Sequence, residues 1–81
     1  MHMDAKHEIM GILREIRPEF DFTESTDFIN AGMLDSFDIV QLVNGLDETY
    51  GISIDGTDIL PENFSSLETI IDLLKKNGVT T

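Results

Sequence analysis

The chain has 81 residues, of which 41% are hydrophobic, and this allows one small domain with one compact core. It has no cysteine, which excludes a disulfide scaffold, a thiolate zinc site and a cysteine nucleophile. The net charge of −11 is the opposite of the balance that a nucleic-acid-binding protein carries. No apolar run is long enough for a membrane span, and residues 1–12 lack the apolar stretch of a signal peptide, so we expect a cytoplasmic protein.

Acidic residues dominate the middle of the chain. No lysine or arginine occurs between Pro18 and Leu74, whereas this stretch holds all but three of the 16 acidic residues. A surface that only needs to be solvated usually mixes both signs, because like charges repel one another and destabilise the compact state. The single-sign stretch therefore favours attraction of a partner with a basic patch, with simple solubility as the alternative.

A first helix is predicted over about residues 4–17, and Pro18 ends it because proline cannot continue the hydrogen-bond ladder. Residues 18–35 show no sustained period but contain three phenylalanines, so we expect a long connection that packs against the core. A short turn near residues 27–30 is predicted within it, with Gly32 as its stop. The apolar residues at helical spacing in the first helix are Ile9, Ile12, Leu13 and Ile16.

Asp35 is the expected N-cap of a second helix, which Gly51 closes. Gly45 lies inside this helix and costs roughly 1 kcal/mol relative to alanine. It either permits a close approach of another helix or is merely tolerated. The apolar stripe of the helix comprises Ile39, Leu42, Val43, Leu46 and Tyr50, whereas Asp38, Gln41, Asp47 and Glu48 are expected mostly on the outward face.

The last third of the chain is predicted to hold a short helical turn at residues 57–60 and a final helix over about residues 66–76. Ile52 and Ile54 alternate like a strand, but no partner strand is evident. The run from Ser65 to Glu68 reads as a capping box that opens the final helix.

These elements predict an all-α fold, a small four-helix bundle of three main helices and one short helix, with a long loop between helices 1 and 2. We expect a single domain over residues 1–81, with its core at about residues 4–76.

Catalysis is hard to assemble from this sequence. Both histidines, His2 and His7, lie near the N-terminus, and no serine has the histidine and aspartate spacing of a nucleophilic triad. A helical domain of this size has little room for a closed cleft. We therefore expect no enzymatic activity and no catalytic or metal-binding residue.

Ser36 is the most informative position. It follows the N-cap Asp35, where free backbone N–H groups and the helix dipole favour a phosphate ester on the serine. The flanking Asp35 and Asp38 would keep such a phosphate from folding down onto the helix. Physical reasoning alone leaves two interpretations open, an exposed phosphoester site and a serine that only assists the helix cap.

The sequence resembles the acyl carrier protein family, including peptidyl and D-alanyl carrier proteins, over about residues 9–76. The resemblance depends on Asp35-Ser36 followed by the apolar spacing of residues 39–43, with Phe28, Gly32 and Leu34 ahead. Ile52, Pro61 and residues 67–70 match the end of the family pattern. Fatty-acid carriers usually have leucine where this chain has Phe37, so the resemblance is closer to D-alanyl and freestanding aminoacyl carriers.

This resemblance implies that Ser36 carries 4′-phosphopantetheine, which a phosphopantetheinyl transferase attaches from coenzyme A. Acyl or aminoacyl groups would be held on its thiol as thioesters, and a monomeric carrier would shuttle them between an activating ligase and acyl-transferring enzymes. The acidic second helix would dock on basic patches of these partners. The alternative function is a small acidic interaction module that is never modified.

For partner contact the sequence favours Asp35, Asp38, Asp47 and Glu48, with Phe37 and Val40 close to the attachment site. For Val40, packing in the core is an equal alternative.

Overall fold

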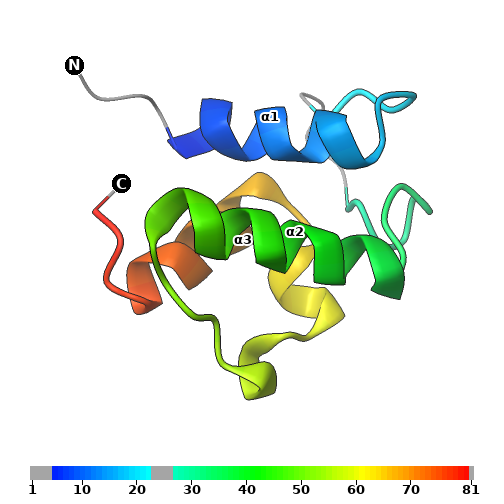
Figure 1. Ribbon diagram of the computed structural model, residues 1–81. Helices are drawn as coiled ribbons and strands as arrows, with labels where there is room; N and C mark the ends of the chain where they lie inside the picture. Colours follow the sequence, from blue (N-terminus) through cyan, green and yellow to red (C-terminus); the bar gives the residue numbers. More distant parts are fainter. Residues whose placement is uncertain (1–4, 23–26, 81) are drawn as a thin grey trace.

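The computed structural model describes residues 5–22 and 27–80, and within them it confirms the all-α fold. Its three α-helices are α1 (Ala5–Ile16), α2 (Ser36–Tyr50) and α3 (Leu67–Lys76) (Figure 1). Two short 3-10 helices, η1 (Gly56–Asp58) and η2 (Pro61–Phe64), connect α2 to α3. No helix in these two ranges combines the length and the apolar character that crossing a bilayer requires.

The predicted helix boundaries agree with the structure to within a residue or so at each end that it describes. Asp35 caps α2, and Gly51, which has a φ of 63°, ends it in the left-handed conformation that favours glycine. The predicted first residue of helix 1, Asp4, lies outside the described residues.

The capping box of α3 lies one residue further along than predicted. Ser66 is the N-cap, and it exchanges hydrogen bonds with Thr69. The Thr69 hydroxyl accepts the hydrogen bond from the N-cap backbone N–H that the sequence assigned to the carboxylate of Glu68. Glu68 is instead exposed.

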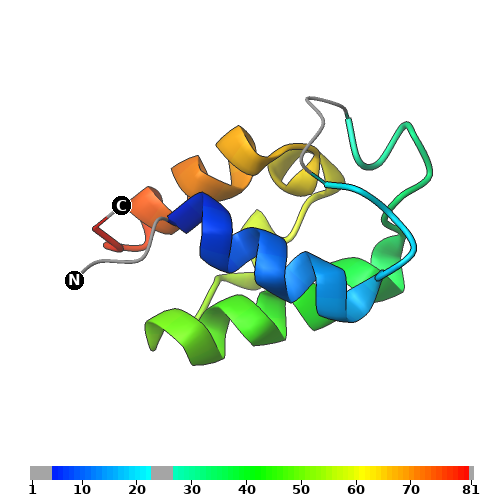
Figure 2. The same cartoon turned by 90° about the horizontal axis from the view of Figure 1, so that it is seen from above.

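The three helices enclose one core, with α1 lying across α2 and α3 (Figures 1 and 2). In both views the end of α1 lies at the same end of the molecule as the start of α2, where the long connection also lies. This arrangement brings residues from the end of α1 to the first turn of α2. The largest fully buried side chains are Phe22, Phe28, Phe64, Ile9, Leu13, Leu42, Leu46, Ile70 and Leu74.

The long connection between α1 and α2 packs into the core, as predicted. The rings of Phe22 and Phe28 meet edge to face with centroids 5.1 Å apart, and both residues are buried. The backbone N–H of Phe28 donates to the Ser65 carbonyl at 2.7 Å, which ties the connection to the segment before α3. The Asp27 side chain accepts from two backbone N–H groups in the predicted turn, and Gly32 follows with a φ of 74°.

The segment after α2 holds two 3-10 helices where the sequence predicted one helical turn. Ile54 is buried, and its backbone N–H donates to Asp47 Oδ1 at 3.1 Å. This side-chain bond supplies the partner that a neighbouring strand would otherwise provide, so the alternating pattern of Ile52 and Ile54 does not lead to a strand in the described ranges.

At Gly45, a side chain of α1 lies directly against the backbone of α2. A Cβ atom at this position would lie 2.9 Å from Ile12 Cγ2, closer than van der Waals contact allows. Of the two interpretations of Gly45, the structure favours the close approach of a helix.

We expect Gly45→Ala to yield none of the gain of about 1 kcal/mol that alanine usually brings to a helix interior. The added methyl group would press on Ile12 Cγ2, and a β-branched side chain in a helix has little freedom to turn away. Gly11→Ala in α1 is the matched control, since nothing lies within 4 Å of its Cβ position. Urea unfolding of both variants measures the difference. Equal stabilisation at the two positions would show that α1 moves aside without cost.

Candidate functional site

A reciprocal pair of hydrogen bonds fixes the first turn of α2. The backbone N–H of Asp38 donates to Asp35 Oδ1 at 2.9 Å, and the backbone N–H of Asp35 donates to Asp38 Oδ2 at 3.2 Å. These bonds satisfy donors that every helix start leaves open. The backbone on either side of Ser36 is therefore held rigidly.

Ser36 is the first residue of α2 and is exposed. Its hydroxyl makes no hydrogen bond with any part of the chain that the structure describes, whereas Asp35 and Asp38 form the cap. The interpretation of Ser36 as a mere capping residue is therefore wrong. The site presents a free hydroxyl on a rigid helix start.

Asp38 is buried, with only 4% of its surface exposed, so the expectation that it faces outward is wrong. The cap draws its carboxylate back toward the helix start, and Arg17 Nε donates to Asp38 Oδ2 at 2.8 Å. A buried carboxylate is tolerated when it is paired and hydrogen-bonded in this way. Asp38 therefore belongs to the framework of the site and not to its outer surface.

Arg17 joins the end of α1 to the start of α2. Besides Asp38, its guanidinium contacts Asp35 Oδ2 through Nη2 and Glu19 Oε2 through Nη1, both at 3.3 Å. The backbone N–H of Asp38 is the main cause that lowers the pKa of the Asp35 carboxyl below its ordinary value of 3.8, and the charge of Arg17 acts in the same direction. Asp35 is therefore ionised at neutral pH, and the stabilisation from its lowered pKa is lost only as acid protonates it.

Sequence reasoning missed Arg17. Its partners Asp35 and Asp38 lie 18 and 21 positions away, so no local spacing indicates the contact. The available signal was its position, because it is the last basic residue before a long acidic stretch and directly follows a helix.

The surface beside Ser36 is apolar. Phe37 is 71% exposed and Val40 is 53% exposed, so the alternative that Val40 packs in the core is wrong. These two residues are one and four positions after Ser36, which places all three at the same end of α2. Large exposed apolar side chains in a cluster mark interaction surfaces.

Asp47 and Glu48 lie near the other end of α2. Asp47 is half-buried and accepts the Ile54 N–H, so its carboxylate serves the fold. Glu48 is exposed but follows Ser36 by 12 residues, which at 1.5 Å per residue is about 18 Å along the helix axis. The structure therefore does not bring Asp47 or Glu48 together with Ser36.

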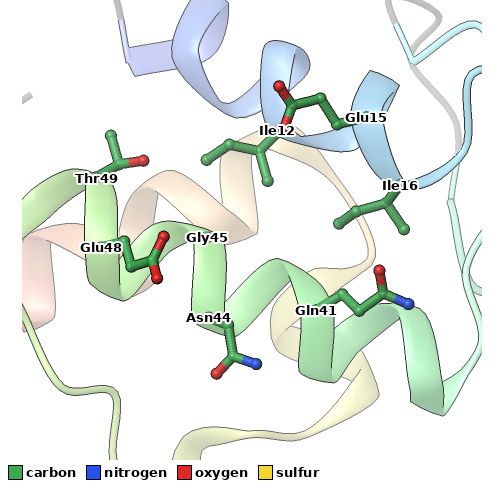
Figure 3. Close-up of a pocket in the computed structure, with 8 residues that line it drawn as sticks. All are labelled: Ile12, Glu15, Ile16, Gln41, Asn44, Gly45, Glu48 and Thr49. Carbon is green, nitrogen blue, oxygen red and sulfur yellow. The ribbon is translucent and has the colours of Figure 1, made fainter.

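Glu48 lines a groove between α1 and α2 with a volume of about 460 Å³. Figure 3 shows Ile12 and Ile16 of α1 pointing toward α2, with Gly45 between the polar side chains of α2. The groove is bordered by the carboxylates of Glu15 and Glu48 and is lined further by Gln41, Asn44 and Thr49.

Charge reversal is expected to destabilise the fold at Asp38 and to leave it nearly unchanged at Glu48. Asp38→Lys removes one half of the cap and places an ammonium group against Arg17 in a buried position, so it should lower the unfolding free energy by about 2 kcal/mol or more. Glu48→Lys makes the same charge change on an exposed position of the same helix and should stay within about ±0.5 kcal/mol.

Chemical denaturation of the two variants measures this difference. Equal stability of the two proteins would show that the burial of Asp38 contributes nothing to the fold.

Comparisons with known proteins identify the family of this chain. The family model for the phosphopantetheine attachment site (PP-binding) matches residues 7–74, which include all of α2. The chain is also similar to aminoacyl carrier protein 1 of Bradyrhizobium diazoefficiens, with 34% identity over 62 residues that cover 76% of this chain and 68% of the relative. No solved structure matches it significantly. The chain belongs to the carrier proteins of the phosphopantetheine attachment family, whose cofactor is covalently bound 4′-phosphopantetheine.

Proposed function

We propose that this protein is a carrier that is phosphopantetheinylated on Ser36 and shuttles acyl or aminoacyl groups as thioesters between partner enzymes. The observation that supports it most directly is the exposed Ser36 hydroxyl, which no described group engages, on a helix start that Asp35 and Asp38 cap without it. The carrier itself needs no catalytic residue, because the partner enzymes perform the chemistry. We infer that it is not an enzyme.

The residues present fit the attached group. In the loading reaction, Ser36 Oγ attacks the phosphorus of coenzyme A that bears the pantetheine arm, and a new P–O bond forms as the bond to adenosine bisphosphate breaks. The serine proton passes to a base of the transferase. The attached group supplies a thiol that holds the cargo as a thioester, and tethering raises the effective concentration of the cargo at each partner.

An aminoacyl cargo is favoured over a fatty acyl cargo. The support is the similarity to a relative named as an aminoacyl carrier protein, together with Phe37 at the position after the serine. An adenylating ligase that activates an amino acid is the class of enzyme that would supply such a cargo. We infer that loading and transfer take place in the cytoplasm, where coenzyme A is available.

For docking we propose the exposed apolar pair Phe37 and Val40 at the start of α2. Partner enzymes with a basic patch would be attracted by the net charge of −11, and Glu48 and Asp35 contribute to that field from exposed positions. Asp38 and Asp47 are unsuited to direct partner contact, because their carboxylates are engaged within the fold.

Loading of Ser36 is tested with coenzyme A, a broad-specificity phosphopantetheinyl transferase and intact mass. The wild type is expected to gain one phosphopantetheinyl group, and Ser36→Ala none. Circular dichroism should show the same helicity for both proteins, because the Ser36 hydroxyl makes no hydrogen bond in the described structure. Modification that persists in Ser36→Ala would overturn the assignment, and an unmodified wild type would favour the interaction module.

Phe37→Ser is expected to slow loading about tenfold, because an exposed aromatic side chain beside the reacting hydroxyl is a typical anchor for a partner. Leu60→Ser is the matched control, since Leu60 is also apolar and 42% exposed but lies between the two 3-10 helices. Initial rates of loading measure the effect, and thermal melts should be unchanged in both variants. Equal rates for Phe37→Ser and the wild type would remove Phe37 from the docking surface.

A further inference from the structure

We propose that Arg17 is a positioning residue that supplies the counter-charge for the phosphodiester on Ser36 and so orients the base of the attached arm. This inference depends on the proposed modification of Ser36. It assigns a role to a residue of the long connection, outside the helix that carries the serine.

The first argument is the local charge. In the sequence, Ser36 is flanked by Asp35 and Asp38 in the first turn of α2, and Arg17 contacts both of these carboxylates as well as Glu19. A phosphodiester keeps one negative charge at neutral pH, so loading adds a further anion to three carboxylates. Arg17 is the one cation that contacts this cluster in the described ranges, and no lysine or arginine follows it in the sequence before Lys75.

The second argument is the geometry of the guanidinium. Its planar group has five N–H donors, and the three contacts with Asp38, Asp35 and Glu19 use one donor each. The Arg17 side chain is 35% exposed, so the guanidinium lies at the edge of the core and is not sealed within it. A guanidinium fork of this kind suits phosphate oxygens.

The three contacts also differ in length and in the burial of the carboxylate. The bond from Nε to the buried Asp38 is 2.8 Å long, whereas the contacts with the exposed Asp35 and Glu19 are both 3.3 Å long. A new anion at Ser36 would therefore compete for Nη1 or Nη2 and leave the Asp38 contact in place. Asp38 anchors the arginine, and the outer donors stay free to exchange partners.

The test compares unmodified and loaded forms of the wild type, Arg17→Gln and Arg14→Gln. Arg14→Gln makes the same charge change one turn earlier on α1, where the arginine is exposed and contacts no carboxylate that the structure describes. At about 0.15 M salt the Debye length is roughly 8 Å, which suppresses long-range effects of net charge. For each protein, the change in Tm on loading is measured. In Arg17→Gln this change is expected to be about 2–4 °C more negative than in the wild type and in Arg14→Gln.

Two further measurements separate this role from a purely structural one. The NMR signals of the Arg17 guanidinium N–H groups should move on loading in the wild type, and the ³¹P signal of the arm should differ between the wild type and Arg17→Gln. If loading shifts the Tm of all three proteins equally and leaves the Arg17 signals in place, the proposal is overturned.

Ser36→Asp keeps the test independent of loading, because it places an anion at position 36 directly. We expect this substitution to lower the Tm more in the Arg17→Gln background than in the wild-type background. If this coupling is observed but the wild-type protein accepts no phosphopantetheine, the modification of Ser36 is refuted and the charge-balancing role of Arg17 is retained. Equal effects of Ser36→Asp in both backgrounds would refute the role of Arg17, whether or not Ser36 is loaded.

Discussion

The contact between Arg17 and the buried Asp38 carboxylate holds the end of α1 against the start of α2, and the geometry around Ser36 depends on it. Removing a carboxylate from water is costly, and the cost is offset here by a guanidinium hydrogen bond of 2.8 Å and by the backbone N–H of Asp35. Because Asp38 also completes the helix cap, one side chain fixes both the tertiary contact and the local start of the helix. Ser36 lies within that first turn, and its hydroxyl takes no part in the cap hydrogen bonds.

The rest of the fold supports this end of the molecule. The edge-to-face rings of Phe22 and Phe28 anchor the long connection in the core, and the bond from the Phe28 N–H to Ser65 ties it to the region before α3. Gly45 allows α1 to lie close to α2, and Arg17 joins the same two helices just after the end of α1. In a chain of 81 residues, such specific contacts compensate for the small size of the core.

The fold could be predicted from the sequence wherever the signal was local. Asp35 before an apolar stripe and Gly51 after it mark both ends of α2, because caps are short-range hydrogen-bond patterns. The burial of Asp38 could not be predicted, since it depends on an arginine 21 positions away. The cap of α3 was ambiguous for another reason, because the consecutive serines at 65 and 66 both offer a hydroxyl and only the packed structure selects Ser66.

The first turn of α2 divides its residues between two tasks. Asp35 and Asp38 hold the backbone, whereas Phe37 and Val40 project into solvent with 71% and 53% exposure. Substitutions at exposed positions usually change stability little, so these two side chains can be exchanged without a compensating change in the core. The helix start thus combines a fixed backbone with two exposed apolar positions, whose side chains can change without altering the cap.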